Sequence, residues 1–328
     1  MARLCELFAE RLAPGDPVAE KLLGWPADGS ALRQLIALRI AGALHAMVLR
    51  KQSAALVAAW PPNDVSDDVL WSAVRNTCST QADVLLPWLE RAPQTNEIRR
   101  SSILVTGFLA IAERARQPLL ISEIGASAGI NLHWDQYQYR FGSMTFGNSR
   151  SGVQLEPRWQ GALPPAVVPR ILDRAGCDLF PIDPGAPDAE ERLLPYIWAD
   201  QFERLARTRA GLRFAASRPE RVTRADVLEW LPERLAMQPN GSVHVICHTI
   251  VWQYFDQKTQ RLAQSMIEEA GVGATESRAL AWLSFEADNN PHGAALQLRY
   301  WPGDIRVPLA RADFHGRWIE WEGWPQSN

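Results

Sequence analysis

The chain has 328 residues, 47% of them hydrophobic and 22% charged, close to the averages for soluble globular proteins. Its 34 basic and 37 acidic side chains leave a net charge of −3, too balanced for a general electrostatic affinity for DNA or RNA. This length favours a core domain with a sizeable additional region. The composition therefore excludes a wholly disordered chain and predicts no nucleic-acid partner.

Three features predict a cytoplasmic protein with no membrane segment. The four cysteines are far apart and form no Cys-x-x-Cys pair, which argues against a zinc knuckle or a secreted disulfide framework. Residues 1–10 mix acids into their apolar positions, unlike a signal peptide. The longest apolar segment, residues 35–49, is interrupted by Arg39 and His45 and is shorter than the roughly 20 residues that span a bilayer.

Residues 1–116 show the spacing of amphipathic helices. Apolar residues recur at three- and four-residue steps, as at Ile36, Ile40 and Leu44. Ser66 then offers a helix cap before two acids, and the helix after it is expected to run through Leu86. A further helix is expected to lead into the next feature. These patterns predict an all-α N-terminal region.

The pattern changes at residue 117, where strands and helices begin to alternate. Residues 119–122 are interpreted as a buried strand, followed by a small-residue turn and a helix from Ile130. Residues 242–249 have the clearest pattern of a buried strand, with helices expected at 201–216 and 257–270. Such alternation predicts a parallel, doubly wound sheet.

The fold class follows from the remaining segments. Residues 139–199 are rich in Gly, Pro and Arg and are interpreted as an insertion with a strand or hairpin near 140–146. Four later runs predict antiparallel strands: 279–286, 294–301, 305–311 and 317–321. We therefore expect an α/β domain over residues 117–328, with a mainly parallel sheet and antiparallel C-terminal strands, preceded by the helical region 1–116.

The turn after the first predicted strand, residues 123–129, carries a candidate nucleotide loop. Gly125 permits a turn that a Cβ would obstruct, and small neighbours let a ligand approach the following helix. Glu123 can accept hydrogen bonds from a cationic or hydroxylated ligand. A dinucleotide loop needs Gly-x-Gly-x-x-Gly, but Ser127 and Ile130 hold its second and third glycine positions. This weakens a nicotinamide dinucleotide interpretation.

In arrangement the loop resembles the first motif of Rossmann-like S-adenosylmethionine-dependent methyltransferases, acid-x-Gly-x-Gly-x-Gly, with serine replacing the middle glycine. The resemblance implies that S-adenosylmethionine is the cofactor. The residues that it implies for the site are Glu123, Gly125, Ser127, Gly129 and Asn131. A strand-to-helix turn with a purely structural role is the alternative interpretation.

The same resemblance implies acids after the second and third strands. An aspartate after the third strand commonly bonds the adenine amino group, which implies that role for Asp226, although an aspartate at this junction also suits an ordinary helix N-cap. Asp178 and Asp183 are both candidates for the ribose hydroxyls. Asn96 and the two arginines at 99–100 precede the helix before the first strand, where they reach either the cofactor carboxylate or a solvated face.

His248 ends the strand 242–249, at the edge where open α/β sheets bind ligands. Imidazole can take a proton from an attacking oxygen or nitrogen near neutral pH, so we predict His248 as the base for methyl transfer to a small-molecule or protein acceptor. A histidine that only packs is the alternative. His244 shares the strand, but no third ligand accompanies the pair, so no metal site is predicted.

Two other classes of function remain open. Residues 125–129 match the Gly-x-Ser-x-Gly nucleophile elbow of serine esterases, with Ser127 as nucleophile. That hydrolase would need Asp288 with His292 or His315 to complete its triad. The other alternative is a non-catalytic Rossmann-like module used for ligand binding or assembly. Neither the methyl acceptor nor an oligomeric state follows from the sequence.

Several segments together resemble a bacterial family known as domain of unknown function 2332. They are Thr95-Asn-Glu97, Glu123-Ile-Gly-Ala-Ser-Ala-Gly-Ile-Asn-Leu132, Gly176-Cys-Asp-Leu179 with Pro181-Ile-Asp183, Trp198-Ala-Asp-Gln201 and His315-Gly-Arg-Trp318. The resemblance covers nearly the whole chain. Because the family's name supplies no reaction, function must be argued from the site.

Overall fold

The computed structural model describes residues 2–26, 35–220 and 222–325, which pack into two compact units. The first unit combines Met1–Thr95 with Pro187–Arg209, and the second combines Asn96–Ala186 with Ala210–Asn328. The described part of the chain contains no helix with the length and apolar character needed to cross a membrane.

The first unit is helical, as the spacing of its apolar residues predicts. Its helices are α1 (Ala2–Arg11), α2 (Pro17–Leu23), α4 (Ile36–Leu49), α5 (Ala54–Ala59), α6 (Asp67–Thr80), α7 (Ala82–Glu90), α9 (Ala189–Leu193) and the 3₁₀ helix η3 (Leu194–Tyr196). Ser66 caps α6 by accepting a hydrogen bond from the amide of Val69. The single helix expected through Leu86 is instead two helices, since α6 ends at Thr80 and α7 begins at Ala82.

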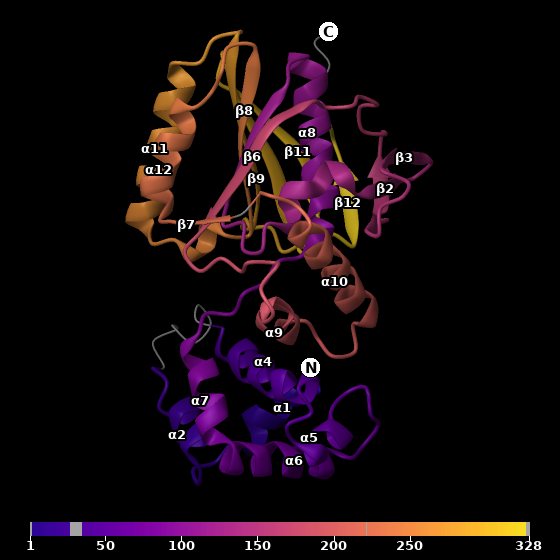
Figure 1. Ribbon diagram of the computed structural model, residues 1–328, viewed down its shortest axis with the longest axis vertical. Coiled ribbons are helices and arrows are strands. Elements are labelled where there is room, and N and C mark those ends of the chain that lie inside the picture. The colour runs from indigo at the N-terminus through magenta and orange to yellow at the C-terminus, as the bar shows by residue number, and fades with distance from the viewer. Residues whose placement is uncertain (1, 27–34, 221, 326–328) are drawn as a thin grey trace. The chain divides into compact units, whose positions relative to one another are not determined.

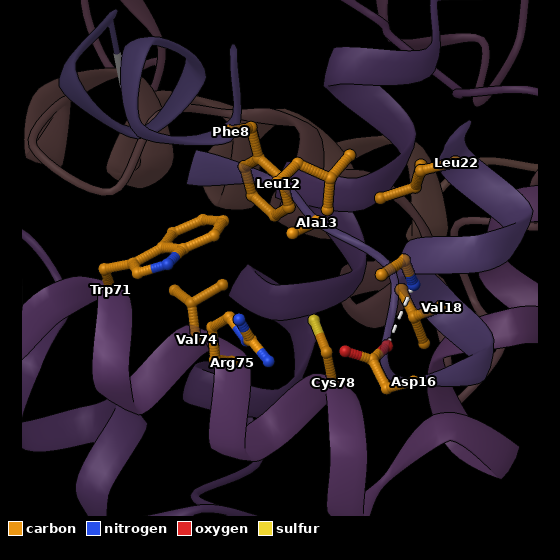
Figure 2. A pocket seen from close by; sticks show the side chains of 11 residues that line it. Phe8, Leu12, Ala13, Asp16, Val18, Leu22, Trp71, Val74, Arg75 and Cys78 are labelled. Carbon is orange, nitrogen blue, oxygen red and sulfur yellow. Dashed lines mark hydrogen bonds between the residues drawn. The ribbon is translucent and has the colours of Figure 1, made fainter. Parts of the chain in front are cut away.

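Large apolar side chains fill this unit. Leu44, Met47 and Leu56 are fully buried in its core. Figure 2 shows a small hollow between α1, α2 and α6, beside which Asp16 accepts a hydrogen bond from the amide of Ala19. At about 10 Å³ the hollow has room for at most one water molecule. It is a packing defect of the core, too small for a substrate.

The second unit is built on a nine-stranded sheet within the described residues, in the order β5-β12-β11-β10-β9-β8-β1-β6-β7. Its strands are β1 (Leu119–Ile124), β5 (Arg158–Gly161), β6 (Ile171–Asp178), β7 (Val222–Arg224), β8 (Ser242–Thr249), β9 (Arg278–Glu286), β10 (Ala294–Trp301), β11 (Ile305–Ala312) and β12 (Trp318–Trp321). Strands β7, β6, β1, β8 and β9 are parallel, and β10, β11 and β12 add antiparallel. The mixed α/β class and the antiparallel C-terminal strands are confirmed.

Helices cover both faces of the sheet (Figure 1). Helix α8 (Ser101–Ala115), preceded by the 3₁₀ helix η1 (Ile98–Arg100), packs on one face, and α11 (Val227–Ala236) and α12 (Gln257–Val272) pack together on the other. Helix α10 (Phe202–Ala216) continues from the first unit into the second. A small sheet of β2 (Gln138–Phe141), β3 (Met144–Gly147) and β4 (Gln154–Leu155) confirms the hairpin expected near residues 140–146.

Two elements of the second unit differ from the sequence predictions. The segment after the glycine loop is a distorted 3₁₀ helix, η2 (Ile130–Gln136), because His133 leaves helical geometry at φ −100° and ψ 23°. Strand β6 was not predicted, because polar and half-exposed residues interrupt its apolar pattern. It nevertheless pairs with β1 along its length and thereby brings Asp178 to the carboxyl edge of the sheet.

Candidate functional site

The candidate site lies at the point in the parallel sheet where the order of strand addition reverses. The chain enters at β1, adds β6 and β7 on one side, and then returns to add β8 and β9 on the other. The connections that follow β1 and β8 therefore leave the carboxyl edge of adjacent strands in opposite directions. Open α/β sheets bind ligands at such a switch point.

The glycine loop takes a left-handed backbone at three positions, Gly125 (φ 69°), Ser127 (φ 54°) and Gly129 (φ 70°). A Cβ on Gly125 would lie 2.4 Å from Cγ2 of Val251, which follows β8. Glycine is therefore required here both by the turn and by the close approach of the two connections at the switch point.

Backbone amides of the loop bind the end of β6. The amides of Gly125 and Ala126 donate to the carbonyl of Cys177 at 2.9 and 3.0 Å. The amide of Ser127 donates to Oδ2 of Asp178 at 3.0 Å. Since these donors already have protein acceptors, the loop cannot bind a phosphate in the manner of a dinucleotide loop without losing these bonds.

Asn96 occupies the next amides of the loop. Its Oδ1 accepts from the amide of Ala128 at 3.1 Å and from that of Ile130 at 3.4 Å. In a nucleophile elbow, the amide after the serine forms part of the oxyanion hole. Here that amide is the one of Ala128, which Asn96 already engages. Asn96 thus serves as a support for the loop.

Glu123 ends β1 directly before the loop. It is 2% exposed, and its carboxyl group makes no hydrogen bond within the described part of the chain. Burial, and secondarily the nearby Asp178, raise its pKa to about 8, while Arg100 acts in the opposite direction. A buried acid in this condition is costly for the fold unless something supplies a donor or a positive charge.

Two further predicted acids lie after neighbouring strands of the sheet, and Asp178 is near enough to Glu123 to raise its pKa. Asp178 accepts from the amide of Phe180 through Oδ1, and Asp226 caps α11 by accepting from the amide of Leu228 at 2.8 Å. The pKa of the Cys177 thiol is raised to about 12, mainly by burial and also by the negative charges of Asp178, Asp226 and Glu123. Each of the three carboxylates therefore lies near enough to Cys177 to influence its thiol.

Two other predicted residues make contacts of a different kind, although the amide of Ile182, next to Asp183, donates to the carbonyl of Ser127 at 3.2 Å. Asp183 lies in an exposed turn, where its Oδ1 accepts from the amide of Gly185 at 2.9 Å. Asn131 is buried, and its Oδ1 accepts from the hydroxyl of Ser101 on α8 at 2.7 Å. The geometry therefore favours Asp178 over Asp183 as a ligand-binding acid and gives Asn131 a packing role.

His248 is held on all sides at the end of β8. Its Nδ1 lies 2.7 Å from Oε1 of Glu286, and the indole nitrogen of Trp282 donates to its Nε2 at 2.9 Å. Its ring stacks on Trp252 with centroids 4.8 Å apart. Because an indole can only donate, Nε2 must accept, and Nδ1 must carry the proton. The Trp282 bond would have to open before His248 could take a proton from a substrate.

Glu286 is a residue of this edge that the sequence reasoning missed. Its Oε1 accepts from His248 and also from the amides of Val251 at 3.0 Å and Trp252 at 3.3 Å. One carboxylate therefore fixes both the imidazole and the connection after β8. The only signal in the sequence was an acid at the end of the strand 279–286.

The residues of the hydrolase alternative do not meet. Asp288 is bound by Arg311 through short bonds of 2.6 Å, and His292 stacks on Trp318 and lies 3.1 Å from Glu320. His315 lies beside Glu97. Neither histidine pairs with Asp288, so the structure does not assemble the triad that Ser127 would need.

Other hollows and clusters give no stronger site. A groove of about 390 Å³ lies over β9, β10 and β11 beside α12, and its lining includes Trp282, Gln297 and Arg306. No helix connects β9 to β10 in the described chain, which leaves this face of the sheet open. Within residues 2–26, 35–220 and 222–325, no three His, Cys, Asp or Glu side chains are placed to hold a metal ion.

The fold is that of an α/β protein whose mainly parallel sheet has a switch point between β1 and β8. Residues 1–321 match the family described as "Uncharacterized protein conserved in bacteria (DUF2332)". The chain belongs to this family. A search of curated proteins found no match to the chain.

Proposed function

We infer that the chain binds S-adenosylmethionine, and we propose methyl transfer to a small-molecule or protein acceptor as its function. The observation that carries this proposal is Glu123, a carboxyl group 2% exposed at the end of the central strand, without a hydrogen bond in the described residues. A ligand with a positive charge and hydroxyl donors would compensate its burial. S-adenosylmethionine has a sulfonium, an ammonium and ribose hydroxyls.

The strand order supports the same proposal. Numbered in chain order, the five parallel strands lie in the sheet as 3-2-1-4-5, which is the order of the corresponding Rossmann strands. The occupied loop amides argue against a ligand bound through its phosphates, whereas the neighbouring carboxyl groups of Glu123 and Asp178 suit a cation. The residues therefore fit an adenosyl sulfonium better than a dinucleotide.

Each acid takes a role that is compatible with its present bonds. Glu123 would face the cationic part of the ligand and Asp178 the ribose hydroxyls, while Asp226 would accept from the adenine amino group through Oδ2, since Oδ1 caps α11. The cofactor, when bound, supplies an electrophilic methyl group. The chain itself would contribute orientation of the two reactants, which accounts for most of the acceleration in such a transfer.

Isothermal titration calorimetry tests the proposal. We expect micromolar binding of S-adenosylmethionine and S-adenosylhomocysteine, and none of ATP or NAD at the same concentrations. Asp226→Ser keeps a helix cap but shortens the side chain, so it should weaken binding about tenfold, the effect of one lost hydrogen bond to a charged group. Asp256→Ser, at the cap of α12, is the matched control and should change affinity less than twofold. Folded protein that binds neither adenosyl compound would overturn the proposal.

The geometry of His248 favours one second candidate, a non-catalytic module that keeps the nucleotide pocket. Both ring nitrogens of His248 are engaged, as expected of a packing residue. Transfer of tritium from methyl-labelled S-adenosylmethionine to a bacterial small-molecule extract or to bacterial protein distinguishes the two. Binding without any transfer would favour the module.

A further inference from the structure

The turn between β11 and β12 is rigid and presents a histidine. Oδ1 of Asp313 accepts from the amides of His315 at 3.0 Å and Arg317 at 3.2 Å, and both of its oxygens bind the Arg317 guanidinium. Asp313 is itself buried, and its pKa is lowered by the Arg317 bonds, which outweigh the opposing effect of burial. The backbone that carries His315 is thus fixed from within.

The same turn is attached to the segment before α8. A Cβ on Gly316 (φ 67°) would lie 2.7 Å from the carbonyl oxygen of Arg99, so only glycine permits this approach. The Nε of Arg100 donates to the carbonyl of Phe314 at 3.0 Å. The residues on both sides of His315 are therefore anchored to residues 99–100, although more than 200 residues separate them along the chain.

These contacts place His315 beside Glu97. Nδ1 of His315 lies 3.7 Å from Oε2 of Glu97, whose side chain is 1% exposed, whereas the histidine side chain is 44% exposed. Since Nδ1 is enclosed, the exposed part of the ring lies toward Nε2. The 3.7 Å distance is longer than a hydrogen bond, as the distances within catalytic pairs often are in the absence of substrate. A half-exposed imidazole with its buried nitrogen facing a buried carboxylate is the arrangement of a general base and its orienting acid.

The pair belongs to the edge that carries the candidate cofactor site. Asn96, next to Glu97, accepts from the glycine-loop amides of Ala128 and Ile130. Arg100, three residues after Glu97, donates to the carbonyl of Thr249 at the end of β8 and influences the pKa of Glu123. His315 therefore lies at the border of the switch point, in a turn packed against the short segment 96–100 that supports the glycine loop.

We propose that His315 accepts the proton of the methyl acceptor, with Glu97 as the positioning residue that holds the imidazole. This deepens the proposed methyltransferase function and rests on it. It also specifies the acceptor class, a hydroxyl or an ammonium group that must lose a proton. As the acceptor atom bonds the methyl carbon, the methyl–sulfur bond breaks with its electron pair going to sulfur, and the acceptor's proton moves to Nε2 of His315.

The charged groups that face His315 set its reactivity. Glu97 faces Nδ1, Asp313 and Arg317 lie within its own turn, and Arg99 and Arg100 belong to the segment packed against it. Loss of the Glu97 charge removes the negative neighbour that favours the imidazolium. The pH midpoint of histidine modification should therefore fall in Glu97→Gln, whose amide oxygen can still accept from the amide of Arg99.

Carbethoxylation by diethyl pyrocarbonate, read for each histidine by peptide mass spectrometry, tests the proposal on the full chain. His292 is the matched control, because it is also exposed and lies 3.1 Å from a glutamate, Glu320. Saturating S-adenosylhomocysteine should slow His315 modification at least fivefold and leave His292 within twofold. Glu97→Gln should lower the pH midpoint for His315 by about one unit, as expected of one nearby opposite charge, and leave that for His292 in place.

The outcomes separate this proposal from the proposed function. If calorimetry shows S-adenosylhomocysteine bound while His315 is modified at its free rate, the histidine lies outside the site and the proposal fails alone. An unchanged pH midpoint in Glu97→Gln would overturn the pair. Absence of any binding overturns the proposed function, and this proposal with it. Unreactive His45, His133, His244 and His248, which are all buried, verify that each variant is folded.

Discussion

The two sides of the switch point satisfy their buried polar groups in opposite ways. After β1, Glu123 is buried without a hydrogen bond in the described residues, and its pKa is raised to about 8 by burial. After β8, His248 and Glu286 are hydrogen-bonded to each other. His248 also accepts from the indole of Trp282, and Glu286 accepts from two backbone amides. Buried polar groups with hydrogen-bond partners stabilise a fold. A buried polar group without one lowers stability, and a ligand can remove that penalty. The contrast is what the proposed function expects, with the ligand on the β1 side and structural support on the β8 side.

The largest expected effect is the pH dependence caused by Glu123. Its folded pKa of about 8 exceeds the ordinary value of 4.5, so between these pH values the folded state holds a proton that the unfolded state has released. The free energy of unfolding should therefore fall as pH rises through this window, by up to about 1.4 kcal/mol per pH unit and on the order of 5 kcal/mol in total.

Urea unfolding at steps from pH 5 to pH 9 measures this effect, with Glu123→Gln as the reference. The variant stays neutral, so the difference between wild type and variant isolates this carboxyl group. Parallel stability profiles for the two proteins would mean that Glu123 has a partner at this edge and that the contrast between the two sides is mistaken.

Glu286→Ala should produce the next largest effect. It deprives the His248 Nδ1–H and the amides of Val251 and Trp252 of their shared acceptor, at a cost of about 3 kcal/mol of unfolding free energy. Glu320→Ala breaks an exposed His–Glu contact, in which His292 is 57% exposed, and should cost less than about 0.5 kcal/mol. Chemical denaturation measures both losses of unfolding free energy. Equal losses would contradict a structural role for the β8 side.

Gly125→Ala tests the contact between the two sides. Alanine at this position would have to hold a left-handed backbone, and its Cβ would also clash with Val251. We therefore expect the free energy of unfolding to fall by about 2.5 kcal/mol. Gly241→Ala has a similar φ of 74° with no atom within 4 Å of its Cβ, and should lose only about 1 kcal/mol. The difference between the two losses of unfolding free energy measures the steric cost of the contact with Val251. Equal losses would show that the loop adjusts to the added Cβ without cost.

Local pattern was sufficient to predict the elements with strong periodicity. Strand β8 is buried at every position, and the strands from β9 to β12 alternate in burial, so both have clear signals in the sequence. Strand β6 has no such signal because it includes Arg174, whose charge is compensated by Asp135 at 2.9 Å from a segment 39 residues away. Such non-local compensation is invisible to periodicity.

The candidate site follows the same rule. Glu123, Gly125 and Asp178 were predictable because strand ends and turns have recognisable residue types. The links between segments were not predictable: Asn96 reaches the loop amides over 32 residues, and Glu286 reaches His248 over 38. The place of His248 in the sequence therefore predicted that it lies at the end of a strand, at the carboxyl edge of the sheet. It did not predict that both of its ring nitrogens would be hydrogen-bonded there.

The smallest expected effect concerns the indole bond to His248. Trp282→Phe keeps an aromatic ring but removes the donor to Nε2, which should cost about 1 kcal/mol beyond the lost ring area. Trp252→Phe, whose indole nitrogen donates to no described residue, removes similar area without a hydrogen bond and corrects for that area. Urea denaturation of both variants gives the comparison. If the losses are equal, the indole bond contributes nothing, Nε2 can be released without cost, and the prediction of His248 as a base is strengthened. A clear difference instead places His248 with Glu286 among the groups that only support the site.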